Sequence, residues 1–212
     1  MTDFGDSIDL IDEVLSTARS VRRKLDFDRP VERQVLLDAI NVAVQAPTGI
    51  GGESWRFVVV DEARRKARIA ELYSETLLGL LADRGMPLKA THRALIERMP
   101  DIPALVFVCY TAPPIAQGWS PDTVGSQVGY YGSILPAAWS LMLALRARGI
   151  GTTWTSLLSA RQAEVAEVIA MPDECVQMVM LPVAYTKDAV LKRAERLPAE
   201  AVTYWNAWGD QG

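Results

Sequence analysis

Apolar residues recur at helical spacing along several stretches of the chain. Residues 8–18 set isoleucine, leucine and valine among acidic residues, which predicts an amphipathic helix with Asp6 and Ser7 at its N-cap. A second helix is expected between Pro30 and Pro47, because proline is tolerated in the first turn of a helix and stops one further along. The same spacing predicts further helices in residues 63–83, 91–98, 124–148 with a break near Pro136, and 160–170.

Short runs without polar residues predict buried strands. Residues 55–60, 104–110 and 177–185 are such runs, and residues 152–155 suggest a brief additional strand. Residues 134–145 are apolar on all sides but too short to span a bilayer, which indicates a helix covered by protein. No repeat or linker interrupts the pattern, so we expect one globular domain over residues 1–212.

Composition and charge exclude several classes of function. Half of the residues are hydrophobic, and 26 acidic residues outnumber 22 basic ones, so no overall positive field would recruit nucleic acid or an anionic membrane. Cys109 and Cys175 are far apart and form no CxxC pair. The acidic N-terminus does not resemble a signal peptide. We therefore expect a cytoplasmic protein without nucleic-acid or membrane partners.

Metal and triad chemistry are not expected. His92, the single histidine of the chain, falls in a polar helical pattern without an HxxxH partner, so we predict a surface residue and no metal site. The same shortage of histidine argues against Ser-His-Asp and Cys-His mechanisms, and no GxSxG motif is present.

A glycine-rich loop and a basic cluster are the candidate ligand-binding features. Residues 46–55, APTGIGGESW, join a predicted helix to a predicted strand, and they match neither a P-loop nor the GxGxxG motif. The cluster ARSVRR supplies guanidinium groups and a hydroxyl, which bind phosphate well. The residues by themselves leave a structural turn and a solvated basic face open as alternatives.

The order of motifs resembles the nitroreductase family of FMN enzymes. The matching stretches run from about residue 15 to 208 and read ARSVRR, PV at 30–31, APTGIGGESWRFVVV, LMLALRARGIGTTW, MPDECVQMVMLPVAY and RLPAE. The resemblance implies an α+β, three-layer α/β/α fold, in which helices flank a central mixed, mainly antiparallel sheet. It also implies an intertwined homodimer with FMN at the interface, touched by both chains.

The resemblance assigns roles residue by residue. Arg19, Ser20 and Arg22 match the motif that holds the FMN phosphate and reaches the pyrimidine edge of the flavin, and Arg22 would stabilise negative charge there. Arg196 matches the C-terminal phosphate-binding arginine. The remaining expected cofactor contacts are Pro47, Thr48, Gly49, Gly51 and Glu53 in the flavin loop, and Thr155, Ser156 and Leu157 near the flavin N5 edge.

Three positions depart from the family pattern. Ala18 replaces a common arginine, and Gly51 and Glu53 stand where the flavin loop commonly has asparagine and glutamine. Because Gly51 removes a polar anchor and Glu53 introduces a carboxylate, these changes bear on the reactivity of a bound flavin.

The activity implied is hydride transfer from NADH or NADPH through FMN to nitroaromatic, quinone or enone acceptors, by a ping-pong mechanism. Trp119, Tyr130 and Tyr131 are candidate walls of the substrate pocket, with core or dimer packing as the alternative. Three other hypotheses remain: an FMN-storage protein with little turnover, a relative that fragments flavin or removes halogen, and a helical scaffold with a chance basic patch.

Overall fold

The computed structural model describes residues 5–49, 52–111 and 124–210. The chain divides into two compact units, a terminal unit of Met1–Ala18 with Val190–Gly212 and a central unit of Arg19–Ala189. The single domain expected over residues 1–212 remains a prediction.

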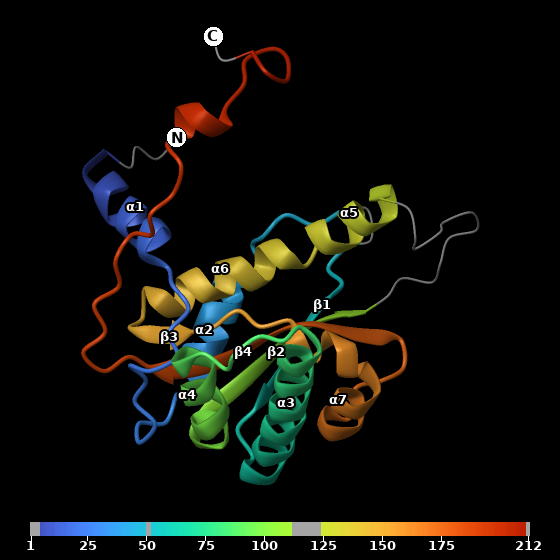
Figure 1. The fold of residues 1–212 in the computed structure, drawn as a ribbon. Coiled ribbons are helices and arrows are strands. Elements are labelled where there is room, and N and C mark those ends of the chain that lie inside the picture. The colour runs from blue at the N-terminus through green and yellow to red at the C-terminus, as the bar shows by residue number, and fades with distance from the viewer. Residues whose placement is uncertain (1–4, 50–51, 112–123, 211–212) are drawn as a thin grey trace. The chain divides into compact units, whose positions relative to one another are not determined.

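A four-stranded sheet forms the middle of the described central unit (Figure 1). Its strand order is β1 (Trp55–Val60), β2 (Ala104–Thr111), β4 (Cys175–Tyr185) and β3 (Ile150–Thr152), and every neighbouring pair is antiparallel. A parallel bridge of Ser20 with Thr152 adds to the β3 edge. The mainly antiparallel sheet predicted from the sequence is confirmed.

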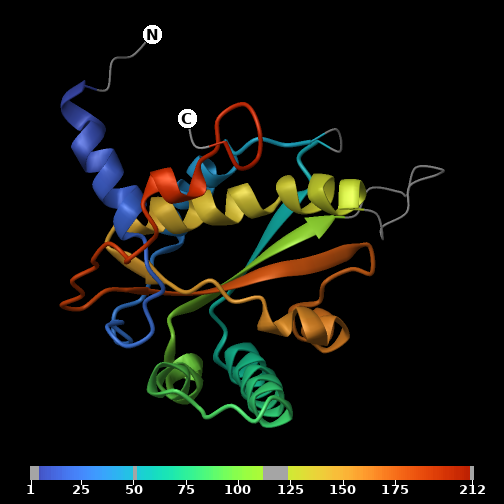
Figure 2. The same ribbon diagram turned by 45° about the horizontal axis from the view of Figure 1, so that its top comes forward.

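Helices cover both faces of this sheet, as Figure 2 shows. On one face, α2 (Arg33–Ala43) and α6 (Leu135–Arg146) share a core cluster with Val106 and Val108 of β2. On the other, α3 (Ala63–Asp83), α4 (Ala90–Arg98) and α7 (Gln162–Ile169) pack with Leu105 and Phe107. Because alternate residues of a strand point to opposite faces, the apolar run in β2 supplies both cores. The three-layer α+β fold is confirmed.

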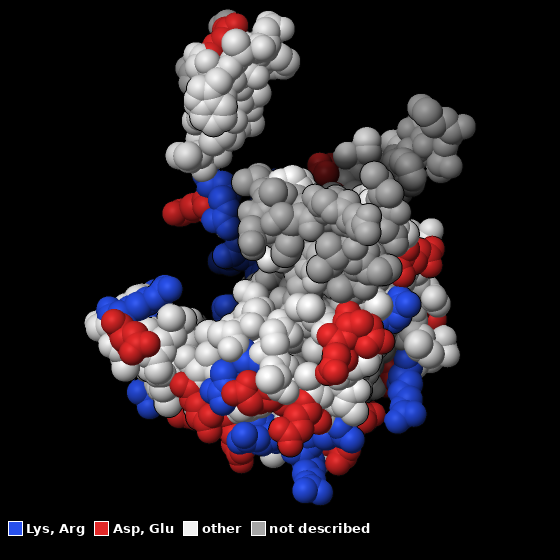
Figure 3. Space-filling view, turned by 90° about the vertical axis from the view of Figure 1, so that its right-hand side faces the viewer, with Lys and Arg blue, Asp and Glu red and all other residues white. Residues whose placement is uncertain are grey.

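Charged side chains are interspersed over α3 and α7, as Figure 3 shows. Several are joined in ion pairs close in sequence, including Arg65 with Glu62, Arg68 with Glu71 and Arg161 with Glu164. A surface of mixed sign agrees with the slight acidic excess of the chain.

The helical stretch Gln127–Arg146 is long and apolar enough to cross a membrane by length and composition, but 44% of its apolar window is buried inside the protein. It comprises α5 (Val124–Gly132) and α6, which together correspond to the predicted broken helix. The break falls just before Pro136, which takes a place in the first turn of α6, where its missing N–H is not needed. Core helices of this kind pass the same length and composition test as membrane spans.

Three predicted boundaries are wrong in detail. The helix expected after Pro30 begins at Arg33, and the brief strand expected at residues 152–155 is Ile150–Thr152, followed by a single bridge from Thr155 to Met180. The helix predicted from residue 160 begins at Gln162, after a 3-10 turn, η3 (Leu157–Arg161). The bounds of β3 are decided by its pairing with β4 and by the bridge from Thr155 to Met180, which local propensity does not register.

The terminal unit contains α1 (Ile8–Thr17) and a 3-10 turn, η4 (Ala199–Val202). Ser7 precedes α1 but makes no side-chain cap, because its backbone is already helical in the turn η1 (Gly5–Ser7). The tail stacks Tyr204 on Trp208 with ring centroids 4.9 Å apart. This unit exposes many large apolar side chains, namely Ile8, Leu10, Ile11, Leu15, Leu197, Val202, Trp205 and Trp208. Such a surface is typical of an interface.

Candidate functional site

The predicted phosphate-binding segment is fixed along the edge strand β3. Ser20 bridges to Thr152, the Val21 amide donates to the Thr152 carbonyl at 2.9 Å, and the Thr153 hydroxyl donates to the Val21 carbonyl at 2.9 Å. Arg19 and Ser20 are exposed and Arg22 is half-buried. Among the described residues, no ion pair or hydrogen bond engages the side chains of these two arginines. The backbone is therefore ordered while the cations stay free for an anion.

Gly151 explains why this segment lies so close to β3. A Cβ at this position would come within 3.0 Å of Val21 and Leu25 side-chain atoms and 2.9 Å of the Thr186 Cγ2. Any larger residue would push the segment away from the strand. Packing within this chain therefore requires glycine at position 151 of the GIGT motif.

The loop after β3 is the second part of the predicted site. The Thr155 amide donates to the Met180 carbonyl at 3.2 Å, and the Met180 amide donates back to Thr155 at 2.8 Å. The Leu157 amide reaches the Thr155 hydroxyl at 3.5 Å. Ser156 is exposed, and its N–H makes no hydrogen bond to a described residue. The loop offers one free backbone donor.

These two parts lie close together in the central unit. Ser20 contacts Thr152 directly, and Thr155 follows Thr152 by three residues, a span of at most roughly 10 Å. The structure therefore brings Arg19, Ser20 and Arg22 to the same sheet edge as residues 155–157.

The glycine loop is held by the junction of α5 and α6. The Gly49 amide donates to the Ser133 hydroxyl at 3.0 Å, and Ser133 in turn donates to the Gly129 carbonyl at 2.8 Å. Gly52 has a φ of 71°, which favours glycine. Pro47, Thr48 and Gly49 are exposed, and Gly51 lies outside the described residues. The described part of the loop thus presents its backbone at the surface.

Glu53 follows the glycines at the start of β1. Its carboxylate forms no ion pair or hydrogen bond with a described residue, although Arg56 is near. The Arg56 guanidinium instead donates to the carbonyls of Glu53 at 3.1 Å and Trp55 at 2.7 Å. Arg56 therefore forms no direct ion pair with the Glu53 carboxylate.

The glycine loop and the basic segment lie at opposite edges of the sheet. The loop leads into β1 and the basic segment lies on β3, and these are the two outer strands. At about 4.8 Å between neighbouring strands, the four spacings from β1 through β2, β4 and β3 to the basic segment add up to roughly 19 Å across the sheet. The central unit does not bring these two groups together.

Arg196 belongs to the terminal unit, where its exposed guanidinium donates to the Glu195 carbonyl at 3.0 Å.

The predicted aromatic walls divide into different environments. Tyr130 packs against the core and stacks on Tyr110 with centroids 3.9 Å apart, and burial raises the pKa of Tyr130 to about 12. Tyr131 meets Tyr130 edge-on at 5.5 Å and is exposed. Trp119 lies outside the described residues. Core packing, the alternative left open by the sequence, describes Tyr130.

Two supporting groups were missed from the sequence. Ser133 accepts a hydrogen bond from the Gly49 amide. Its only signal in the sequence is that it is a small hydroxyl residue shortly before Pro136, which lies in the first turn of α6. Tyr185 donates to the Glu32 carboxylate at 2.8 Å and lies 3.4 Å beneath the Arg29 guanidinium, while its carbonyl accepts from the Asp26 amide. This contact anchors the chain beyond Arg22. Its partners are distant in sequence, so no local pattern could have found it.

The described residues contain no group of three or more His, Cys, Asp or Glu side chains that could hold a metal ion. His92 was predicted at the surface, but it is half-buried and its Nδ1 is enclosed without a hydrogen-bond partner in the described structure. The prediction from the polar pattern was wrong because the His92 side chain points partly inward from α4.

Comparisons with known proteins bear on the family and the fold of the chain. The family model described as Nitroreductase family matches residues 15–185. An iodotyrosine deiodinase of Thermotoga neapolitana is 28% identical over 80% of this chain and 85% of its own length. A 5,6-dimethylbenzimidazole synthase of Rhodospirillum rubrum is 24% identical over 87% and 84%. A crystal structure of oxidized iodotyrosine deiodinase bound to FMN and 3-iodo-L-tyrosine superposes with a TM-score of 0.70 and 20% identity, over 92% of this chain and 98% of that one.

Proposed function

The chain belongs to the nitroreductase family, and on that premise we propose that it is an FMN-dependent oxidoreductase. FMN, when bound, would accept hydride from NADH or NADPH and pass it to a nitroaromatic, quinone or enone-type acceptor in ping-pong fashion. The protein would supply binding, orientation and a fixed electrostatic environment.

One observation carries the proposal. Arg19, Ser20 and Arg22 lie on an ordered edge of the sheet without ion-pair partners in the described structure, beside a loop with a free backbone N–H. Guanidinium forks and a hydroxyl form strong charge-assisted hydrogen bonds to phosphate. The donors present therefore fit a phosphate-bearing cofactor.

Each residue has a distinct proposed role. Arg19 and Ser20 would bind the phosphate, and Arg196 is proposed as a further phosphate-binding residue because the resemblance to the family implies it; none of them needs to exchange a proton. Arg22, a half-buried cation, would lie at the pyrimidine edge of the flavin and would stabilise negative charge there without reorganising. Residues 155–157 present backbone to the N5 edge, and among them the Ser156 N–H is the free donor.

A second copy of the chain would complete the site. The glycine loop cannot join the basic segment of the same central unit, since they occupy opposite sheet edges. We propose that Pro47, Thr48, Gly49, Gly51 and Glu53 of one chain face the basic segment of another. The apolar side chains exposed on α1 and the tail are suited to such a homodimer.

Glu53 would then modify the cofactor's reactivity. A carboxylate without a paired cation disfavours negative charge nearby, and Arg56 is engaged with backbone carbonyls. We expect Glu53 to lower the reduction potential of the bound flavin and Arg22 to act in the opposite direction.

The absorbance spectrum of purified protein, before and after anaerobic addition of NADPH or NADH, tests the proposal. We expect yellow protein that is bleached by a nicotinamide and recolours with a quinone or nitroaromatic. Yellow protein that neither nicotinamide bleaches would favour FMN storage. Colourless protein that also fails to take up added FMN would sink the proposal and favour a scaffold with a basic patch.

Reductive removal of halogen is a second candidate, favoured by the similarity to the Thermotoga deiodinase. Halide release from iodinated or brominated phenols by the reduced protein would support it. Chromatography of the flavin after aerobic turnover would show whether FMN is fragmented. The cytoplasmic location and the absence of nucleic-acid and membrane partners remain predictions.

A further inference from the structure

The segment from Thr155 to Gln162 is attached to β4 at both of its ends. Thr155 exchanges two backbone hydrogen bonds with Met180. At the other end, the Gln162 side-chain amide donates to the Gln177 carbonyl at 2.7 Å and accepts from the Gln177 amide at 3.1 Å. Both attachments are reciprocal, so each fixes orientation as well as distance.

The short length of β3 explains the need for these attachments. β3 pairs only with Val183–Tyr185, so the rest of β4 has no strand partner on that side in the described structure. An unpaired buried backbone group costs free energy comparable to a lost hydrogen bond. The Gln162 amide presents one of its two N–H groups and its carbonyl oxygen in the geometry of a peptide group, and it substitutes for a strand at Gln177.

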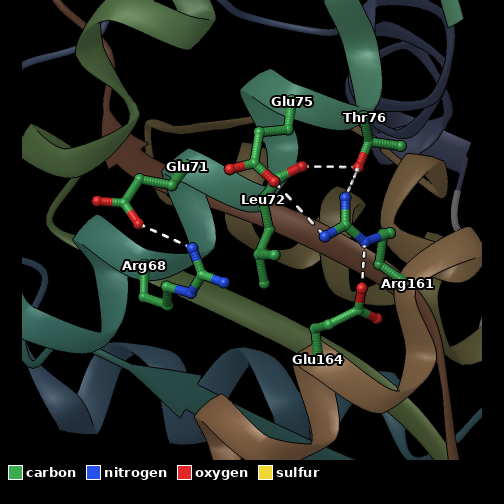
Figure 4. A network of polar contacts seen from close by, with 7 residues as sticks. All are labelled: Arg68, Glu71, Leu72, Glu75, Thr76, Arg161 and Glu164. Carbon is green, nitrogen blue, oxygen red and sulfur yellow. Dashed lines mark hydrogen bonds and ion pairs between the residues drawn. The ribbon is translucent and has the colours of Figure 1, made fainter. Parts of the chain in front are cut away.

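Arg161 fastens the same segment to α3, as Figure 4 shows. Its Nε pairs with Glu164 at 2.5 Å, its Nη1 donates to the Thr76 hydroxyl at 3.4 Å, and its Nη2 lies 3.5 Å from the Glu75 carboxylate. The arginine side chain is only 28% exposed. It therefore bridges η3, α7 and α3.

An apolar contact reinforces the polar ones. Leu158 is 1% exposed and packs in the core cluster that includes Leu72 and Leu77 of α3. The Ser159 amide also donates to the Ser156 carbonyl at 3.0 Å. Between these fixed points Ser156 remains exposed with its N–H free among the described residues, so the segment is rigid around an available donor.

We propose that Arg161 and Gln162 are positioning residues that hold the Ser156 N–H in a fixed direction for the flavin N5 edge. This inference rests on the proposed function, since it assigns the donor a flavin partner. A donor fixed before binding needs no reorganisation, which makes its interaction stronger than that of a mobile loop. Neither residue needs to touch the cofactor.

The test compares Arg161→Met and Gln162→Met with matched controls on other surfaces. Arg33→Met removes an arginine of α2, on the other face of the sheet, whose ion pair is with Asp61, and Gln34→Met removes an amide that bonds Asp38 within α2. Hydrogen exchange of the peptide covering residues 155–160 is measured on the full chain as purified. We expect exchange about tenfold faster than in the wild-type protein for the two test variants. The controls should exchange at the wild-type rate.

The second measurement is the affinity of each variant for oxidised and for reduced FMN. Because an N–H donor favours the oxidised N5, the affinity for oxidised FMN should fall about threefold to tenfold more than that for reduced FMN. A tenfold difference raises the midpoint potential by about 30 mV for a two-electron couple. Arg161→Lys should keep part of the wild-type preference for oxidised FMN. Gln162→Glu should not, because its carboxylate would face the Gln177 carbonyl.

The outcomes separate this inference from the proposed function. Unchanged exchange, or faster exchange with an unchanged ratio of affinities, overturns the positioning role even if the wild-type protein is a working flavoprotein. Failure of the wild-type protein to take up FMN overturns both. If a methionine variant does not fold, Gln162→Glu supplies the disrupted segment and Arg161→Lys the partly retained one, and a lack of difference between these two in exchange and in the ratio of affinities overturns the positioning role.

Discussion

At the scale of single residues, neighbours of like charge have different proposed roles. Arg19 and Arg23 are both exposed in the same basic segment, but only Arg19 is assigned to the phosphate. Comparing substitutions of Arg19 and Arg23 therefore distinguishes a specific contact with the phosphate from a general positive field. A general field would depend on charge and distance alone and would weaken with added salt.

Replacing Arg19 with alanine should weaken FMN binding by about 1.5 to 3 kcal/mol, which is roughly 10-fold to 150-fold in Kd, because a charge-assisted hydrogen bond is lost. Arg196→Ala should have an effect of the same size. Fluorescence quenching of FMN on titration with protein would measure both. Arg23→Ala is the control; an equal loss there would show that only net charge matters.

Cys109 links stability to alkaline pH. Burial raises the pKa of its thiol from the ordinary value of 9.0 to about 12. The native state therefore keeps its proton between pH 9 and 12 while the unfolded state releases it, so stability falls as pH rises, by up to about 1.4 kcal/mol per unit. Urea unfolding between pH 8 and 10 should show a shallower decline for Cys109→Ala than for wild type. Equal slopes would contradict the assignment.

At the scale of elements, the glycine loop depends on a helix junction far away in sequence. Ser133 lies between α5 and α6, and its hydroxyl accepts from Gly49 while donating to Gly129. A Cβ on Gly49 would lie 2.8 Å from this oxygen. The small residue and the hydroxyl are therefore required together.

Gly49→Ala should destabilise the protein by about 1 to 3 kcal/mol through overpacking, and Ser133→Ala by about 0.5 to 1.5 kcal/mol through the lost hydrogen bond. The double variant should lose less than the sum, because removing the Ser133 oxygen relieves the clash. Denaturant unfolding of the four proteins completes the cycle. Additive losses would show that the two residues do not interact in solution.

At the scale of the whole molecule, strand order separates two halves of the proposed site. The outer strands β1 and β3 carry the glycine loop and the basic segment, respectively. Two copies related by a twofold axis could pair each loop with the other chain's basic segment, which would generate two equivalent sites. Dimerisation would then be a condition for cofactor binding.

Mixing two defective chains should restore binding if the site is shared. Arg19→Ala and Thr48→Trp should each bind FMN poorly alone, since each homodimer has the same fault in both sites. After refolding together, random pairing should make about a quarter of the sites intact, because half of the dimers are mixed and each has one good site. Titration with FMN measures this fraction. No recovery in confirmed mixed dimers would mean that one chain builds the whole site.

Most of the elements, and the candidate residues of the proposed site, follow from the sequence by itself. Runs such as Trp55–Val60 and Ala63–Asp83 have the predicted bounds, because continuous apolar runs and helical periodicity are local signals. The basic segment was found because guanidinium and hydroxyl groups near each other in sequence stay near each other in space. Its order relative to the later motifs indicated the family.

The tertiary structure decided what depends on contacts between distant residues. It placed the basic segment against Thr152, ended β3 early, and directed Arg56 to the backbone carbonyls of Glu53 and Trp55 rather than to the Glu53 carboxylate. It also set the glycine loop and the basic segment on opposite edges of the sheet. Strand order and hydrogen-bond partners result from packing over the whole chain, so no local pattern encodes them.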